Sequence, residues 1–115
     1  MSNPLLKKSF LAGVVPITPN SFVKFTASET VGLCTASTDA AIGITDAYCD
    51  PVLGDRLDVT QIGIYEVVAG GAIVRGALVM SDANGHAIPW TTGNWVAGQA
   101  QESAAAGDLI PVKVF

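Results

Sequence analysis

Few side chains in this 115-residue chain could act as an acid, a base or a nucleophile. His86 is the only histidine, and Cys34 and Cys49 are the only cysteines. A histidine can serve as a general base or a metal ligand near neutral pH, but His86 directly follows the turn signal Asn84-Gly85, where an exposed polar side chain is ordinary. Neither cysteine lies in a recognisable nucleophile motif. We therefore expect no catalytic residue and no enzyme activity.

The two cysteines are also too few for a disulfide framework or a structural zinc site. Unpaired cysteines commonly pack as small apolar side chains. We favour two free, partly buried thiols, and a single disulfide between Cys34 and Cys49 is the alternative.

Acidic side chains are grouped in two places that resemble cation sites without matching them. Residues 82–85 have the residue types that open a calcium-binding loop, but the glycine comes too early and the twelfth position is Gly93. Four more carboxylates lie on one expected loop without ligand spacing: Asp46, Asp50, Asp55 and Asp58. The glycine-rich residues 69–76 lack the Lys-Ser/Thr pair of a phosphate loop. The sequence therefore predicts no metal, no cofactor and no small-molecule substrate.

Charged residues make up only 14% of the chain, where about 25% is usual. Six basic and ten acidic residues give a net charge of −4, and no basic run is longer than Lys7-Lys8. Binding to nucleic acid or to an anionic membrane surface needs clustered Lys and Arg, so we expect neither partner. Apolar residues make up 50% of the chain, which is more than a small domain can bury alone. Part of the surface is therefore expected to lie against another protein chain.

Residues 1–20 are expected to form an extended N-terminal arm. They hold Pro4, Pro16 and Pro19, and proline fixes φ and removes a backbone donor, so the stretch should be irregular. Its apolar run is broken by Gly13 and Pro16, which fits neither a secretory signal nor a transmembrane helix. A soluble protein made inside the cell is the expectation.

Five apolar side chains are predicted to anchor a protein partner: Leu5, Leu6, Phe10, Leu11 and Trp95. The first four need a cover, and the arm can either fold back on its own domain or pack on a neighbouring chain. Trp95 lies in a loop rich in Thr, Gly and Asn, where a large ring gives contact area at low entropic cost. Trp90, which has apolar neighbours, is assigned to the core.

From residue 22 onward the pattern is that of strands and turns, and residues 21–115 are expected to form one domain. Strands are expected at residues 22–26, 31–35, 41–45, 56–68, 72–80 and 112–115. Asn84-Gly85 is the strongest turn signal and suits the two positive-φ positions of a type I′ hairpin. Residues 97–106 contain good helix formers, but their alignment with the strand expected at residues 42–46 favours a strand followed by a short turn.

The second half of the chain repeats the first. Four correspondences define the repeat: Val23 with Val79, Ala27 with Ala83, Gly43 with Gly98, and Gly54-Asp55 with Gly107-Asp108. The offset falls from 56 to 55 to 53 residues, which small insertions explain. Two related β-units predict an all-β fold, a small β-barrel or sandwich, and a scaffold rather than one catalytic cleft.

These segments resemble the small cement, or head decoration, proteins of tailed-phage capsids. Four motifs carry the resemblance: Val23-Lys-Phe-Thr-Ala27, Ala41-Ile-Gly-Ile-Thr45, the stretch from Gly63 to Gly76, and Ala105-Ala-Gly-Asp-Leu-Ile-Pro-Val112. The resemblance covers about residues 22–115, and Pro111 and the tryptophan-bearing loop depart from the family pattern.

The resemblance implies a β-rich, barrel-like subunit that forms a homotrimer and adds no chemistry. Such a protein would be made in the host cytoplasm and bind the major capsid protein on the outside of the assembled head. It would strengthen the shell by bridging neighbouring capsid subunits. A head-fibre or tail component is the alternative within the virion, and a small β-barrel ligand-binding module or enzyme is the alternative outside it.

Overall fold

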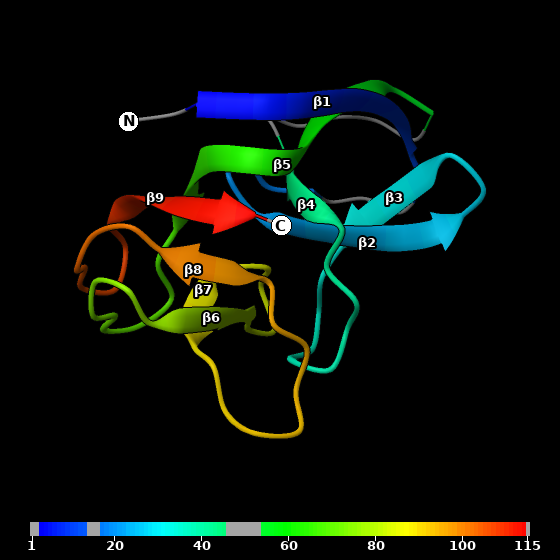
Figure 1. The fold of residues 1–115 in the computed structure, drawn as a ribbon. Coiled ribbons are helices and arrows are strands. Elements are labelled where there is room, and N and C mark those ends of the chain that lie inside the picture. Colours follow the sequence, from blue (N-terminus) through cyan, green and yellow to red (C-terminus); the bar gives the residue numbers. More distant parts are fainter. Residues whose placement is uncertain (1–2, 14–16, 46–53, 115) are drawn as a thin grey trace.

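The computed structural model describes residues 3–13, 17–45 and 54–114. This part of the chain contains nine β-strands and no helix (Figure 1). The strands are β1 (Asn3–Ala12), β2 (Phe22–Ala27), β3 (Thr30–Leu33), β4 (Gly43–Thr45), β5 (Arg56–Val68), β6 (Leu78–Ser81), β7 (Ala87–Pro89), β8 (Gly98–Ala100) and β9 (Leu109–Val114). The all-β class is confirmed, and the stretch with good helix formers contains β8 and bends, as predicted.

All nine strands belong to one mixed sheet, in the order β1-β3-β2-β4-β5-β9-β8-β6-β7. The β1–β3 pair is parallel, and the other strand pairs are antiparallel. β1 also pairs with β5, so β1, β3, β2, β4 and β5 form a closed cycle of pairings. A parallel bridge from Ala69, directly after β5, to Ala87 of β7 closes a second cycle through β6, β8 and β9. We call these cycles the first and the second unit, and β5 is common to both.

Equivalent residues of the two units make the same backbone contacts. Val23 pairs with Gly43 across β2 and β4, and Val79 pairs with Gly98 across β6 and β8. A Cβ on either glycine would overlap the backbone of the next strand, β5 or β9. The glycines that define the sequence repeat are therefore required by the same close approach of strands.

β5 serves both units because its two halves have different partners. Leu57 in the first half pairs with Phe10 of β1, just as Ile110 of β9 pairs with Val67 in the second half. The first half of β5 is thus equivalent to β9, and the second half is equivalent to β1. The matching pairings therefore include residues before residue 22, where the sequence repeat is expected to start.

The N-terminal stretch expected to be irregular contributes a regular strand. Between residues 3 and 11, β1 pairs with β5, and at residues 11 and 12 it pairs with β3. The described residues 3–13 are extended, as predicted, and of the two alternatives they take the one that folds back on their own chain. The irregularity was wrongly expected because the partner strand, not the local pattern, makes β1 regular. The division of the chain at residue 20 stays a prediction.

Two groups of buried apolar side chains fill the interior. The first lies within the first unit and consists of Phe10, Ala12, Ile17, Val23, Val31, Leu57 and Val59. The second fills the second unit, and it includes Phe22, Cys34 and Ile44 from the first unit. Side chains of the first unit thus complete the core of the second, which ties the two units into one folded body.

The β6–β7 hairpin turns at the predicted Asn84-Gly85 pair, but the type I′ assignment is wrong. Gly85 has a φ of 76°, whereas Asn84 is not among the residues with positive φ. Oδ1 of Asp82 accepts hydrogen bonds from the amides of Asn84 (2.8 Å) and His86 (2.9 Å). This side chain organises the turn with one left-handed residue instead of two. The strand expected at residues 72–80 is also shorter, because Gly76 has a φ of 85° and β6 starts after it.

One buried hydroxyl group gives a test of the packing around β5. Thr60 is 1% exposed, and its Oγ1 is the buried side-chain atom without a hydrogen-bond partner in the described part of the chain. An unsatisfied buried polar group costs about 1–3 kcal/mol. Because Thr60→Val keeps the shape and removes the hydroxyl, urea denaturation should show a free energy of unfolding that is about 1 kcal/mol higher.

Ser21→Ala is the matched control for this substitution. Ser21 is fully buried, and its Oγ lies 2.7 Å from Oγ1 of Thr18. Loss of that hydrogen bond should lower the free energy of unfolding by about 1 kcal/mol. If Thr60→Val lowers it as well, the Thr60 hydroxyl has a partner in solution and the packing argument fails.

Candidate binding surface

Three of the five apolar side chains predicted as anchors lie on the surface. Leu5 is 75% exposed, Leu6 is 43% exposed and Trp95 is 49% exposed. Leu11 is half-buried. Phe10 is 2% exposed and belongs to the core of the first unit. In this fold Phe10 supports the sheet from within the core.

Leu5 and Leu6 project because the pairing of β1 with β5 is irregular at this point. Two register shifts leave one extra residue on each strand, Leu5 on β1 and Gln61 on β5. β-bulges of this kind change the direction in which side chains point. Ile62 lies directly opposite Leu6 and is 45% exposed. We call Leu5, Leu6 and Ile62 the β1–β5 patch.

The loop that carries Trp95 is held in one shape by hydrogen bonds. Nε1 of Trp90 donates to the carbonyl of Asn94 (2.8 Å), and the hydroxyl of Ser37 donates to Oδ1 of Asn94 (3.0 Å). The amide of Trp95 donates to the carbonyl of Ser37 (3.2 Å). An exposed ring on a loop that is already ordered loses little entropy when it binds, so Trp95 has the properties of an interface anchor.

The loop that contains Ser37 is fixed in turn by an ion pair. Nζ of Lys24 lies 2.8 Å from Oδ2 of Asp39, which also accepts hydrogen bonds from the amides of Thr35 (2.9 Å) and Ala36 (3.1 Å). The hydrogen bond from Lys24, more than the two amides, lowers the pKa of Asp39. The carboxylate therefore stays charged near neutral pH and holds this loop against β2.

Sequence reasoning missed several exposed apolar side chains: Phe25 (51% exposed), Ile62 (45%), Val74 (71%), Leu78 (38%) and Leu109 (51%). Phe25 shows why. It shares a strand face with the buried Val23, but burial along β2 falls toward its end, where the hairpin extends past the core. Alternation along a strand predicts its faces, and it does not predict where the strand leaves the core.

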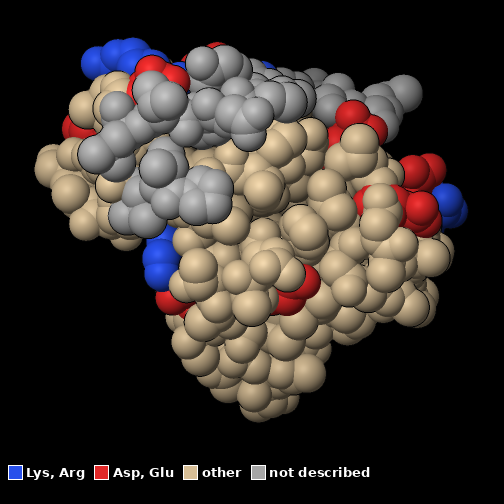
Figure 2. All heavy atoms as spheres, turned by 180° about the vertical axis from the view of Figure 1, so that it is seen from behind, with Lys and Arg blue, Asp and Glu red and all other residues tan. Residues whose placement is uncertain are grey.

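Charged groups leave a wide part of the surface free. Figure 2 shows a face on which most Lys, Arg, Asp and Glu side chains lie near the rim, around a broad uncharged area. The low share of charged residues thus leaves a broad area of this face with few charged groups. Such a surface suits contact with protein rather than with nucleic acid.

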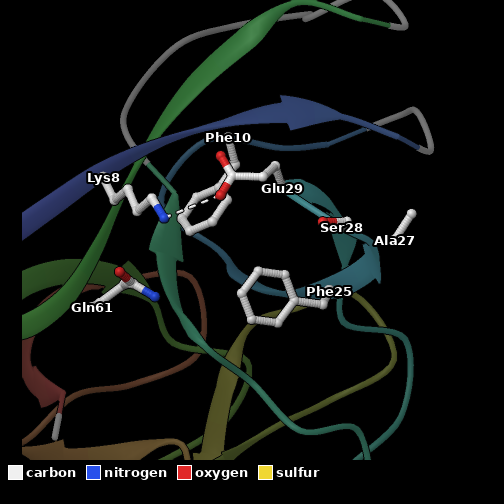
Figure 3. Close-up of a pocket in the computed structure, with 7 residues that line it drawn as sticks. All are labelled: Lys8, Phe10, Phe25, Ala27, Ser28, Glu29 and Gln61. Atoms are coloured by element: carbon white, nitrogen blue, oxygen red, sulfur yellow. Dashed lines mark hydrogen bonds and ion pairs between the residues drawn. The ribbon is translucent and has the colours of Figure 1, made fainter.

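An open cup of about 330 Å³ lies between β1, the β2–β3 hairpin and β5 (Figure 3). Its lining consists of Lys8, Phe10, Phe25, Ala27, Ser28, Glu29 and Gln61. The rings of Phe10 and Phe25 meet edge to face, with centroids 5.4 Å apart. Nζ of Lys8 lies 3.2 Å from Oε1 of Glu29, so the two charges of the lining are paired with each other. The cup therefore suits an uncharged group from a partner better than a charged ligand.

The residues that could carry chemistry are not brought together. Cys34 is a fully buried free thiol, and burial raises its pKa to about 12. His86 is half-buried beside the Asp82 turn. Cys49, and with it the question of a disulfide, lies outside the described residues, as do Asp46 and Asp50.

No three His, Cys, Asp or Glu side chains in residues 3–13, 17–45 and 54–114 lie close enough to hold a metal ion together. The same ranges contain no helix with the length and hydropathy that a membrane crossing requires.

The buried Cys34 thiol should be inert in the folded protein. In a Cys49→Ser variant, labelling of Cys34 by a thiol reagent at pH 8 should follow unfolding, because a thiol with a pKa of about 12 is almost fully protonated and is shielded from solvent. Between pH 9 and 12 the unfolded chain loses this proton while the folded chain keeps it, so the free energy of unfolding should fall as the pH rises. Cys34→Ala should remove that contribution. Rapid labelling under native conditions would show that Cys34 is accessible.

Comparison with known proteins adds two findings. A family model described as "Phage cement protein" matches residues 12–114. Among solved structures, the N base of head fibre gp8.5 in bacteriophage phi29 is similar, with a TM-score of 0.75 and 20% sequence identity over 96% of this chain and 95% of that chain. At this identity the likeness shows a common fold. No curated protein is similar enough to count as a match.

Proposed function

The chain belongs to the phage cement protein family, and we propose that it is a decoration protein of the phage head. The family is structural and non-enzymatic, and its members are associated with the capsid. In this proposal the protein binds the outside of the assembled head and bridges neighbouring major capsid subunits. The observation that carries the proposal is the family match, which spans nearly the whole chain.

The surface supports this role on physical grounds. A bridge between capsid subunits buries area only in the assembled shell, so its binding free energy stabilises the shell and not the free subunits. The β1–β5 patch and Trp95 offer exposed apolar area for such a contact, and Leu11 is half-buried at the other end of β1. We assign these residues to the contact with the major capsid protein, and we leave out Phe10 because it is buried.

We further propose that the protein is a homotrimer on the capsid exterior, made in the host cytoplasm before it attaches. A trimer on a matching symmetry axis engages three sites at once. A modest contact in each subunit then gives durable attachment. No small-molecule substrate, nucleic acid or membrane takes part in this proposal.

We also infer that the two units arose by duplication and that each closed cycle of strands is a small barrel. The matching pairs Val23–Gly43 and Val79–Gly98 support the duplication. The shared use of β5 supports it further, because each half of that strand has an equivalent at one end of the chain.

A head fibre is the second candidate, because the fold is that of a head-fibre base. The two roles differ in copy number and position. A cement protein should cover the shell in many copies, whereas a fibre should form elongated assemblies that bind a restricted set of sites.

Binding to emptied, expanded phage heads tests the proposal. Purified protein should bind in many copies, visible by electron microscopy over the whole shell, and should raise the temperature at which the heads come apart. Leu5→Glu and Trp95→Ala should each weaken binding about tenfold or more, because each removes an exposed apolar anchor. His86→Ala is the control and should bind like the wild type.

Two results would count against decoration of the shell. Absence of binding to heads at any stage of maturation would end the proposal. Binding at a few positions of one kind would favour the head fibre instead.

A further inference from the structure

Residues of the first unit cover the end of the second unit at which the β6–β7 hairpin turns. The amide of Phe22 donates to the carbonyl of Gly85 at the tip of the β6–β7 hairpin (2.7 Å), and the side chain of Leu33 lies against Gly85. The hydroxyl of Ser81 donates to the carbonyl of Asp82 (3.0 Å). Phe22 and Cys34 belong to the buried core of the second unit. As a result, Ser81 is 2% exposed and Gly85 is buried.

At the corresponding end of the first unit the side chains are exposed, while the carbonyl of Glu29 already accepts a hydrogen bond from the amide of Leu11 (2.9 Å). The repeat relates Ser81 to Phe25 and Gly85 to Glu29, and both Phe25 (51%) and Glu29 are exposed. The cup lies between these residues and β1 (Figure 3). Glu29 also has a φ of 59°, in the left-handed region that Gly85 occupies in the second unit with a φ of 76°. Strain of this kind in a non-glycine residue is often found where a protein makes a functional contact.

A surface that corresponds to the closing residues is exposed on the second unit. The hydrogen bond from the amide of Cys34 to the carbonyl of Phe22 (3.0 Å) has its equivalent in the bond from Trp90 to Leu78 (2.9 Å). Leu78 and Trp90 thus occupy the places of Phe22 and Cys34. Pro89, which precedes Trp90, pairs with Val79, which follows Leu78. Leu78 is 38% exposed, Pro89 is exposed, and Trp90 is half-buried. We call these three residues the Leu78 face.

We propose that the Leu78 face of one copy closes the cup of the next copy, as the first unit closes the second within the chain. The two surfaces differ, so the contact is head-to-tail, and head-to-tail contacts can close into rings. This inference rests on the proposed homotrimer and supplies its interface. Charge agrees with it, because Lys8 and Glu29 neutralise each other in the cup and the Leu78 face carries no charge.

Two variants test the contact from its two sides. Phe25→Ser installs the residue found at the equivalent position of the second unit, and Leu78→Glu places a charge on the opposing face. Size-exclusion chromatography with light scattering should give an oligomer for the wild type and monomers for both variants, with self-association weakened about tenfold or more. Mixed in equal amounts, the variants should form a one-to-one dimer, because each keeps the surface that the other lacks.

Val74→Glu is the matched control. Val74 is apolar, 71% exposed and outside both surfaces, so this variant should keep the oligomeric state of the wild type. Thermal unfolding shows whether each variant is folded. If Phe25→Ser melts early, Ala27→Glu, which changes an exposed residue of the cup, takes its place.

Each remaining outcome decides between the two proposals. A monomeric wild type, an oligomer that survives either substitution, or a mixture that stays monomeric would overturn the contact. Binding to heads is measured separately. If the protein is monomeric but still binds phage heads, only the proposed contact between copies is overturned. If the copies associate through this contact but do not bind phage heads, only the proposed decoration role is overturned.

Discussion

The structure depends on the hydrogen bonding of β5 along both of its edges. One edge pairs with β1, and the other pairs with β4 in the first half of the strand and with β9 in the second half. Both units close only because one strand is long enough to serve each of them. Val59 and Val67 place apolar side chains in the two cores, one from each half of the strand. A break in β5 would therefore open both units at once.

Much of the sheet can be read from the sequence, because its signals are local. The strand at residues 56–68 was predicted with its observed bounds, since β-branched and aromatic residues recur there without a turn signal. Gly43 and Gly98 are glycines because any larger side chain would overlap the next strand, which is why they align in the sequence. β1 was not predicted, because its regularity comes from β5 and not from its own proline-containing segment. The hairpin turn was misjudged in type because the Asp82 side chain, four residues before His86, organises it.

The family could also be recognised from short motifs, and the match to the cement proteins confirms both that resemblance and the expectation of a non-enzymatic protein. The binding surface was less accessible to prediction. Leu5, Leu6 and Trp95 are exposed, whereas Phe10 is buried where β1 pairs with β5, and the assignment of all of them to a partner contact stays a prediction. The cup could not be foreseen, because its lining comes from three separate segments that only the closed cycle of strands brings together.

The scarcity of charge on the surface has a consequence for the conditions under which a coat of this protein would hold. Contacts between uncharged side chains are not screened by dissolved ions, unlike contacts between charged groups. Salts such as sulfate even strengthen the burial of apolar area. A phage head coated through such contacts should therefore keep this protein bound at high salt concentrations, at which proteins bound through lysine and arginine dissociate.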